Sequence, residues 1–334
     1  MLSFSRLTAL LIFAVAAFPC GAQVLGNRAV GNDQPKVGTR TAFGVAFTDL
    51  YRINLDTRIA SFVGLSGFSN GQLIGQIRGL NLLPNGDLIA VSGNLRALLR
   101  INKTTGAATV TGNLNLGGTG QFGTALDLSM TVGCDGNYWL ASAVTGQLWR
   151  VNPATAQPTL IGSMGHKITG VVAYGNTLYG AGGQGDTGFY RINMETAETS
   201  MVGNYGPALP WVNVVALSFD EAGTLYASLS YNPGPPGSSV LVDWSDLATI
   251  NTSTGAVTNL GNITGPSALR RQSMNAFVVA PTQCPVVVPP PPPPPPEPVG
   301  DHSVPVPADS AFALILLSLS MITLAYVARG RRHS

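Results

Sequence analysis

Histidine, the side chain best suited to proton transfer at neutral pH, is scarce in this sequence. His166 lies in the middle of the chain, whereas His302 and His333 follow a long run of prolines. A serine-type hydrolytic triad would have to be built around His166, and we recognise no serine and carboxylate that complete one. We therefore predict no catalytic residue, expect the protein not to be an enzyme, and place His166 on a connecting loop.

The acidic residues that could bind a metal ion are spread along the chain. They lack the closely spaced carboxylates of a calcium-binding loop, and the main ones are Asp127, Asp135, Asp186, Asp220 and Asp243. Asp135 and Asp220 stand in turn-like sequences, where turn formation explains them. We predict no metal ligand and no cofactor, and bound calcium stays open as an alternative.

Three aromatic residues are candidates for ligand binding. Trp211, Tyr231 and Trp244 lie in two long insertions, residues 203–213 and 230–246, which are rich in Pro and Gly. Aromatic side chains on loops above a rigid scaffold suit a glycan or a protein ligand. The simpler alternative is that these side chains pack within their own loops.

Charged residues make up only 10% of the 334 residues, and the net charge is +2. Three positive charges, Arg329, Arg331 and Arg332, lie at the extreme C-terminal end, so that the rest of the chain is close to neutral. Nucleic-acid binding requires clustered Lys and Arg that displace counterions from phosphates. We therefore expect no nucleic-acid partner.

One sequence unit recurs five times and organises the middle of the chain. Each unit has two short strand-like segments joined by a turn that begins with asparagine, at Asn54, Asn102, Asn152, Asn193 and Asn251. A second pair of strand-like segments lies between successive units. Repeats of about 40 to 50 residues with four short strands each are typical of propeller blades. The sequence therefore predicts an all-β fold, a β-propeller over residues 41–281.

The first unit lacks a complete front half, because only residues 41–47 precede it. Residues 275–280 resemble the strand-like segment at 170–174, so we expect the C-terminal strand to complete the first blade. Closing the ring in this way removes exposed sheet edges. We predict five blades, with six as the alternative if residues 64–79 and 203–214 contain extra strands.

The repeats resemble those of secreted bacterial propellers that carry Leu-Tyr-x-Ile-Asp/Asn-x-x-Thr-Gly units. That group is diverse, and the resemblance implies the fold and little about the ligand.

The N-terminal segment, residues 1–22, has the features of a signal peptide: a basic Arg6, an apolar stretch over 7–18 and a small Ala22 before the cleavage point. An uncleaved membrane helix and a lipoprotein signal at Cys20 are the alternatives. Residues 23–40 then lead into the propeller. In an oxidising compartment Cys134 and Cys284 could form a disulfide, and free thiols stay equally open.

A proline-rich linker follows the propeller over residues 282–307 and contains eight consecutive prolines at 289–296. Such a run forms a stiff polyproline II rod. We interpret it as a spacer that holds the domain away from a membrane, with a role as a proline-motif ligand as the alternative.

The C-terminal segment, residues 306–334, contains an uncharged apolar stretch at 311–328 that is just long enough to span a membrane. Basic residues follow it at once, which predicts a tail held in the cytoplasm and a propeller outside. The segment resembles the IPTL-type sorting signals of Gram-negative bacteria, relatives of the PEP-type signals. The matching residues are Val306, Pro307, Ser310, Phe312, Arg329, Arg331 and Arg332.

This resemblance implies recognition by a membrane-embedded sorting protease and display at the cell surface, or secretion after processing. The sequence therefore favours an exported binding or structural module of the cell envelope. A metal-dependent propeller hydrolase or lactonase and a passive extracellular-matrix component are the alternatives.

Overall fold

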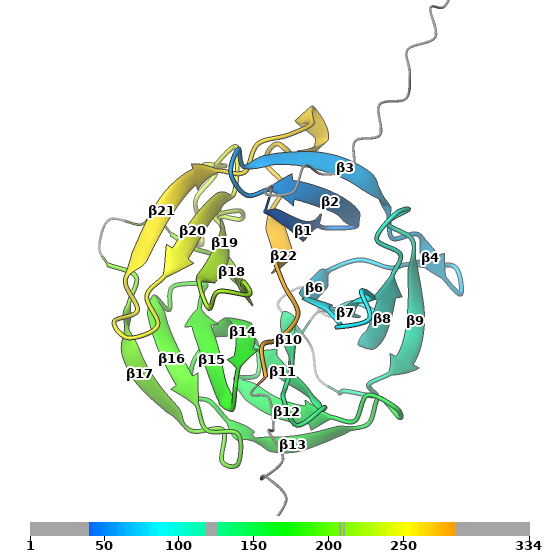
Figure 1. Ribbon diagram of the computed structural model, residues 1–334, viewed down its shortest axis with the longest axis vertical. Coiled ribbons are helices and arrows are strands. Elements are labelled where there is room, and N and C mark those ends of the chain that lie inside the picture. Colours follow the sequence, from blue (N-terminus) through cyan, green and yellow to red (C-terminus); the bar gives the residue numbers. More distant parts are fainter. Residues whose placement is uncertain (1–39, 118–125, 207–208, 210, 285–334) are drawn as a thin grey trace, which may run out of the picture. The chain divides into compact units, whose positions relative to one another are not determined.

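The innermost strands of the protein surround a common axis, and the strands that follow them lie progressively further out (Figure 1). The computed structural model describes residues 40–117, 126–206, 209 and 211–284. These residues form five four-stranded antiparallel sheets and one two-stranded hairpin. The fold is thus an all-β propeller of five blades, as the repeat predicts, and the alternative of six blades is wrong.

Four blades consist of consecutive strands that run in order from the axis outward. The second blade comprises β6 (Ile77–Leu82), β7 (Leu88–Ser92), β8 (Ala97–Ile101) and β9 (Ala108–Asn113), and the third β10 (Leu128–Val132), β11 (Tyr138–Ser142), β12 (Gln147–Val151) and β13 (Pro158–Ser163). The fourth comprises β14 (Ile168–Tyr174), β15 (Thr177–Gly182), β16 (Gly188–Ile192) and β17 (Thr199–Asn204), and the fifth β18 (Val214–Phe219), β19 (Leu225–Ser230), β20 (Asp246–Ile250) and β21 (Val257–Asn262).

The first blade joins the two ends of the propeller, as predicted. Its innermost strand is β22 (Met274–Val278), which pairs antiparallel with β1 (Thr41–Ala46). The strands β2 (Asp49–Asn54) and β3 (Ile59–Leu65) complete the sheet on the outside. Because a late strand is needed to finish an early sheet, the ring closes without leaving an inner strand unpaired.

The repeated asparagine starts the turn between the third and fourth strand of every blade. Its side-chain oxygen accepts hydrogen bonds from the backbone N–H groups two and three residues later, over 2.8 to 3.3 Å. These local bonds satisfy backbone donors that have no partner in the sheet. The asparagine pattern in the sequence therefore reports a real turn.

The glycine that ends each repeat lets neighbouring blades approach closely. A Cβ atom at Gly64 would lie 1.8 Å from the Thr105 carbonyl oxygen, and one at Gly203 would lie 1.8 Å from the Thr254 carbonyl oxygen. In each pair the partner belongs to the asparagine turn of the next blade. The repeat thus encodes contacts between blades as well as the turn within a blade.

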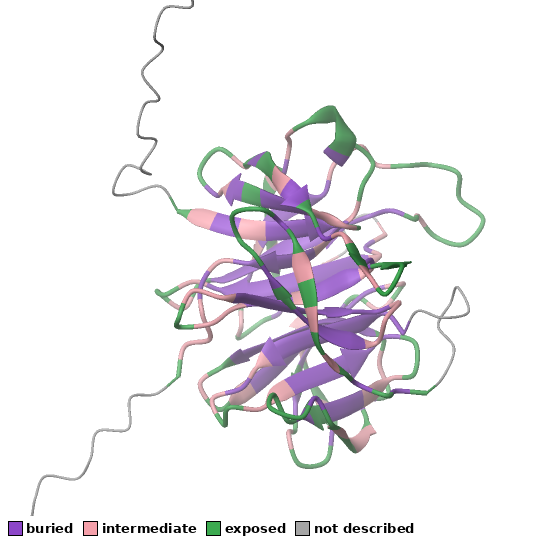
Figure 2. Cartoon of the chain, turned by 90° about the vertical axis from the view of Figure 1, so that its right-hand side faces the viewer, coloured by how far each residue is buried: buried purple, intermediate pink, exposed green. Residues whose placement is uncertain are grey.

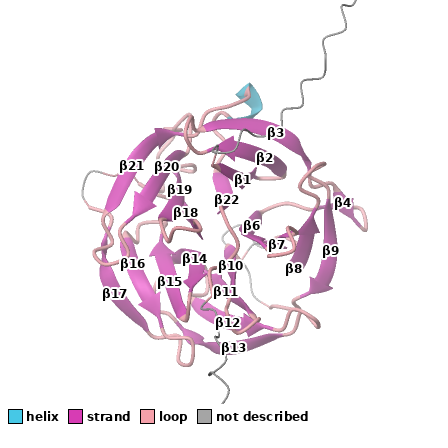
Figure 3. Ribbon diagram, in the orientation of Figure 1, coloured by secondary structure: helices cyan, strands magenta, loops and turns pink. Residues whose placement is uncertain are grey.

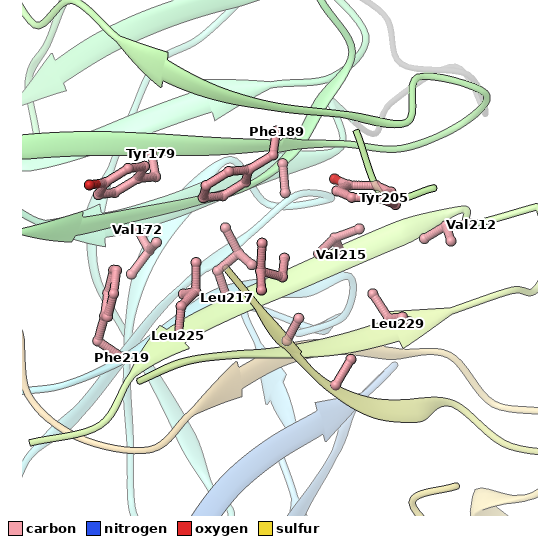
Figure 4. Close-up of a cluster of buried hydrophobic side chains, with 14 of the residues drawn as sticks. Val172, Tyr179, Phe189, Tyr205, Val212, Val215, Leu217, Phe219, Leu225 and Leu229 are labelled. Carbon is pink, nitrogen blue, oxygen red and sulfur yellow. The ribbon is translucent and has the colours of Figure 1, made fainter. Parts of the chain in front are cut away.

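Apolar side chains fill the space between blades, and the buried residues concentrate on the inner strands (Figure 2). Between the fourth and fifth blades, the ring of Tyr179 stacks on that of Phe189 with 5.5 Å between centroids and contacts Phe219 (Figure 4). Tyr226 occupies the equivalent strand in the next blade and is also buried. Both tyrosines pack in the apolar clusters between blades.

Regular structure outside the blades is sparse (Figure 3). The stretch 64–79 contains the hairpin β4 (Phe68–Ser69) and β5 (Gln72–Leu73), and one 3₁₀ turn, η1 (Ser267–Leu269), precedes β22. Within the described ranges, no helix is long and apolar enough to cross a membrane. The predicted signal peptide (1–22) and sorting signal (306–334), with its apolar stretch, lie outside those ranges.

The chain leaves the propeller across the end of the ring where the innermost strands finish. Beyond β22, the Thr282 hydroxyl donates to the Val132 carbonyl oxygen over 2.9 Å, and the Gly175 N–H donates to the Gln283 carbonyl oxygen over 2.8 Å. A disulfide joins Cys284 to Cys134 in the turn between β10 and β11. The exit segment, residues 279–284, is therefore fastened to the third and fourth blades.

Candidate functional site

A cavity of about 300 Å³ lies at the end of the ring where the innermost strands begin. Its lining includes the residue immediately before an inner strand in four of the five blades, namely Gln76, Asp127, Asn213 and Ser273. Loops between the second and third strands of three blades complete it. We call this cavity the channel mouth. The exit segment covers the opposite end of the ring, so the two ends of the propeller differ.

A buried ion pair forms one wall of the channel mouth. Nη2 of Arg78, the second residue of β6, lies 3.0 Å from Oδ1 of Asp127, and the two side chains are only 10% and 8% exposed. Gln184 Nε2 donates to the other Asp127 oxygen over 2.9 Å. A buried carboxylate without such partners is very unfavourable, so these two contacts offset the cost of burying Asp127. They also connect three blades.

Arg78 has hydrogen-bonding capacity that the protein does not use. Its Nε and Nη1 atoms are buried and have no hydrogen-bond partner. Burial lowers the pKa of the guanidinium, and the charge of Asp127 opposes that shift. An arginine starts from a pKa far above neutrality, so Arg78 keeps its charge. A buried cation with unpaired N–H groups therefore stands in the wall of the cavity.

Two amide oxygens at the channel mouth also lack partners. Gln76 Oε1 and Asn275 Oδ1 are buried without a hydrogen-bond donor. Within the described part of the chain, five side-chain N or O atoms are buried and unpaired, and four of them belong to residues that line this cavity. An unpaired buried polar atom costs about 1–3 kcal/mol, so such a concentration indicates a place where another molecule completes the bonds.

The equivalent positions in other blades are satisfied by the protein itself. The second residue of β10, Ser129, accepts a hydrogen bond from Val171 N over 3.0 Å. The second residue of β14, Thr169, accepts one from Val215 N over 3.1 Å. Arg78 and Asn275 occupy the same position in β6 and β22. Among these equivalent strand positions, the unpaired atoms therefore belong to the first and second blades.

Backbone strain is also concentrated at the channel mouth. Eleven non-glycine residues in the described segments have a positive φ, and five of them line this cavity: Phe47, Gln76, Asp127, Gln184 and Arg271. Residues other than glycine seldom adopt this conformation, and strained residues tend to cluster at functional sites. The strain supports the channel mouth as the candidate site.

His166 lies on the connecting loop between β13 and β14, as predicted, and takes part in a second polar cluster. Its Nδ1 lies 3.0 Å from Asp186 Oδ2, and its ring lies 4.2 Å from that of Tyr190. The Tyr190 hydroxyl and the Gly188 N–H both donate to Asp186 Oδ1. Asp186 thus connects two loops through its hydrogen bonds. Burial raises the pKa of the Tyr190 hydroxyl.

The three predicted ligand-binding aromatics are not among the residues that line the channel mouth. Tyr231 is only 4% exposed and donates to Asp246 Oδ2 over 2.6 Å. Trp244 is half-buried against the core between the fifth and first blades. Trp211 is also half-buried, with its ring 3.0 Å from where a Cβ of Gly185 would lie. The structure gives each of them a packing contact and does not gather them on one surface.

The same insertion nevertheless reaches the cavity with other residues. Asn232 and Pro233, which directly follow Tyr231, line the channel mouth. Sequence reasoning missed them, and it missed Gln76, Arg78 and Asn275 as well. A signal was present, because a polar residue stands at the start of the apolar inner strand in several repeats.

Acidic residues do not gather into a metal site within the described ranges, where no group of three or more His, Cys, Asp or Glu side chains is close enough to hold an ion. Asp127 is the one carboxylate that lines the channel mouth, and Arg78 neutralises it. Asp135 and Asp220 accept backbone N–H groups in their turns, as expected. The donor set therefore does not fit a calcium ion at this position.

Residues 67–71 read Gly-Phe-Ser-Asn-Gly, the pattern of a nucleophile elbow. In the structure Ser69 ends the short strand β4, and the turn leads into β5. A nucleophile elbow requires a strand followed by a helix, so this match does not create a catalytic serine.

No protein-family model and no curated protein matches the sequence. Among solved structures, the chain is similar to virginiamycin B lyase from Staphylococcus aureus, with a TM-score of 0.38 and 13% identity over 66% of this chain and 65% of that one. It is similar to a chain of a nidogen/laminin complex, with a TM-score of 0.46 and 14% identity over 74% and 100%. The match thus spans just under two thirds of the lyase, and these likenesses concern the fold alone.

Proposed function

We propose that the protein is an exported, surface-displayed binding module that takes a small polar ligand at the channel mouth. The observation that carries this proposal is the set of four buried, unpaired polar atoms on Gln76, Arg78 and Asn275. A purely structural ring would gain stability by replacing these side chains with apolar ones, as buried polar groups without partners are costly. Retaining them makes sense if a ligand supplies the missing bonds.

The arrangement of the two ends of the ring supports the same proposal. Residues 279–284 bond to the end of the ring opposite the channel mouth, and the disulfide to Cys134 fastens them there. A ligand would therefore enter from the side of the mouth. The described chain ends at Cys284, on the other side of the ring.

Export and surface display rest on the sequence of the chain ends. A cleavable signal at 1–22 and the sorting-signal resemblance of 306–334 support passage across the inner membrane and processing by a membrane-embedded protease. A disulfide such as Cys134–Cys284 forms and persists in an oxidising compartment, which fits this route. Replacing Arg329, Arg331 and Arg332 with serine should retain the unprocessed precursor, detected by its larger size on immunoblots of cell fractions.

A thermal-shift screen of the full-length protein against neutral and acidic saccharides tests the binding function. A ligand that binds the folded state raises the unfolding temperature as its concentration increases. We expect at least one compound to do so in the wild-type protein, with a smaller shift in the variants Gln76→Ala and Asn275→Ala. If every compound leaves the unfolding temperature unchanged, the proposed binding function is wrong, and a passive matrix component would account for the protein better.

A further inference from the structure

We infer that the ligand of the channel mouth is a hydroxylated carboxylate the size of one sugar acid, such as a hexuronate. This inference rests on the proposed binding function and adds the chemical class of the ligand. It follows from the kinds of hydrogen bond that the cavity leaves unmade, from the charges around it and from its size.

The unpaired atoms of Arg78 require acceptors. Nε and Nη1 carry three of the five N–H bonds of a guanidinium, and the ion pair with Asp127 uses Nη2. Guanidinium groups bind carboxylate oxygens through short, charge-assisted hydrogen bonds, which are stronger than bonds to neutral acceptors. The part of the ligand next to Arg78 is therefore a carboxylate.

The unpaired atoms of Gln76 and Asn275 require donors instead. Both are amide oxygens, and an amide oxygen accepts a hydrogen bond from a hydroxyl or an N–H group. Gln76 lies two residues before Arg78, and Asn275 lies on β22, the inner strand that packs beside β6. A ligand that satisfies all three residues must carry hydrogen-bond donors close to its carboxylate, and hydroxyl groups supply them without adding a positive charge.

The surrounding charges favour an anion. Arg78 and Asp127 neutralise each other, while Arg271 at the rim shares the carboxylate of Asp243 with Arg270. One positive charge in this group is left without a counter-charge. The field at the channel mouth therefore attracts a ligand with one negative charge.

The size and rim of the cavity fit a single sugar ring. A volume of about 300 Å³ lies at the lower end of the range for small-molecule sites, which excludes a long chain bound along its length. Phe47 lines the cavity, is 49% exposed and has a φ of 56°, a conformation that is unfavourable for an aromatic residue. Its exposed ring offers an apolar face on which the C–H face of a sugar can rest.

Isothermal titration calorimetry of the full-length protein tests this inference. The titrants are D-glucuronate, its methyl ester, D-glucose, and a glucuronate-ended oligosaccharide, which distinguishes a free acid from a glycan terminus. We expect glucuronate in either form to bind at least about tenfold more tightly than the ester or glucose, because only the free acid has a carboxylate for Arg78.

Variants assign the binding to the channel mouth. Arg78→Gln combined with Asp127→Asn removes both buried charges, so that neither is left unpaired, and should weaken glucuronate binding by about 10- to 100-fold. Asn275→Ala, which leaves the ion pair intact, should weaken it less. The matched control is Arg100→Gln, because Arg100 lies on β8 of the same blade, is exposed and does not line the cavity. It should bind as the wild type does.

The outcomes separate this inference from the function on which it rests. If glucose or the ester binds as well as the acid, or if the double variant binds glucuronate normally, the carboxylate assignment is overturned while the binding function stands. If neither the titrations nor the saccharide screen detects binding, both are overturned.

Discussion

Arg78 and Asp127 form a buried ion pair between the second and third blades, with 3.0 Å between Nη2 and Oδ1. The pair stands at the inner wall of the channel mouth, and Asp127 also receives the Gln184 amide. One interaction therefore joins neighbouring blades and at the same time fixes the guanidinium that we assign to ligand binding.

Removing only one partner of this pair should strongly destabilise the propeller. Asp127→Ala leaves a buried, unpaired guanidinium, which costs about 3–5 kcal/mol of unfolding free energy. Replacing both partners by neutral amides, as in Arg78→Gln with Asp127→Asn, should cost less, because no charge stays buried alone and asparagine tolerates the positive φ at position 127. Urea unfolding followed by tryptophan fluorescence measures both.

The exposed pair Arg40–Asp56 provides the control, since its side chains are 56% and 44% exposed. Asp56→Ala should change the unfolding free energy by less than about 1 kcal/mol. Equal losses of unfolding free energy in Asp127→Ala and Asp56→Ala would contradict this prediction, because the Arg78–Asp127 pair would then contribute no more to stability than an exposed ion pair.

The disulfide between Cys134 and Cys284 should stabilise the closed ring. The two residues are 150 positions apart in sequence, and a cross-link over a long loop restricts the unfolded chain strongly. Changing both cysteines to serine should lower the unfolding free energy by about 2–4 kcal/mol, and reducing the wild type should have the same effect. Unchanged stability in the double variant would mean that the hydrogen bonds of Thr282 and Gln283 hold the exit segment without the disulfide.

The close approach of blades predicts a sharp difference between two glycines. Gly64→Ala places a Cβ 1.8 Å from the Thr105 carbonyl oxygen, so the blades must separate, at a cost of at least about 2 kcal/mol. A Cβ at Gly117 meets nothing within 4 Å, so Gly117→Ala serves as the control. Thermal unfolding of the two variants checks this, and similar melting temperatures would contradict the packing between blades.

Buried tyrosines should make the protein sensitive to alkaline pH. Burial raises the pKa of Tyr51 from 10.0 to about 12, and burial followed by the hydrogen bond to Asp246 raises that of Tyr231 still further. Because the folded-state pKa values exceed the unfolded ones, this stabilisation is fully present below pH 10.0 and decreases as pH rises through the folded values.

The unfolding free energy from urea titrations should therefore stay level up to about pH 9 and decline above pH 10, the ordinary tyrosine pKa. The variant Tyr231→Phe, which has no hydroxyl to ionise, should show a shallower alkaline decline than the wild type. A decline of the same steepness in both proteins would show that ionisation of Tyr231 is not coupled to unfolding.

The sequence predicts the ring well because its determinants are local. Asn54 and its four equivalents form their turn bonds within three residues, so the same short pattern recurs whenever the turn does. The closing strand could also be predicted, because residues 275–280 repeat an inner-strand pattern that the first blade lacks. The turn residues and the spacing of the strands are thus sufficient to predict the number of blades.

The candidate site could not be predicted in the same way, because its residues come from distant parts of the chain. Arg78 and Asn275 meet only when β22 closes the ring beside β6. Conversely, the sequence places Tyr231 in a loop, but in the structure its hydroxyl donates a buried hydrogen bond to Asp246, 15 residues later. Partners of this kind depend on tertiary packing, which no local pattern reports.

A crystal structure of the full-length protein soaked with D-glucuronate tests ligand binding at the channel mouth most directly. We predict the ligand in the channel mouth, with its carboxylate within hydrogen-bonding distance of Arg78 and hydroxyl groups facing Gln76 and Asn275. A saturated crystal with only water at those three side chains, or with the ligand on another part of the surface, would contradict it.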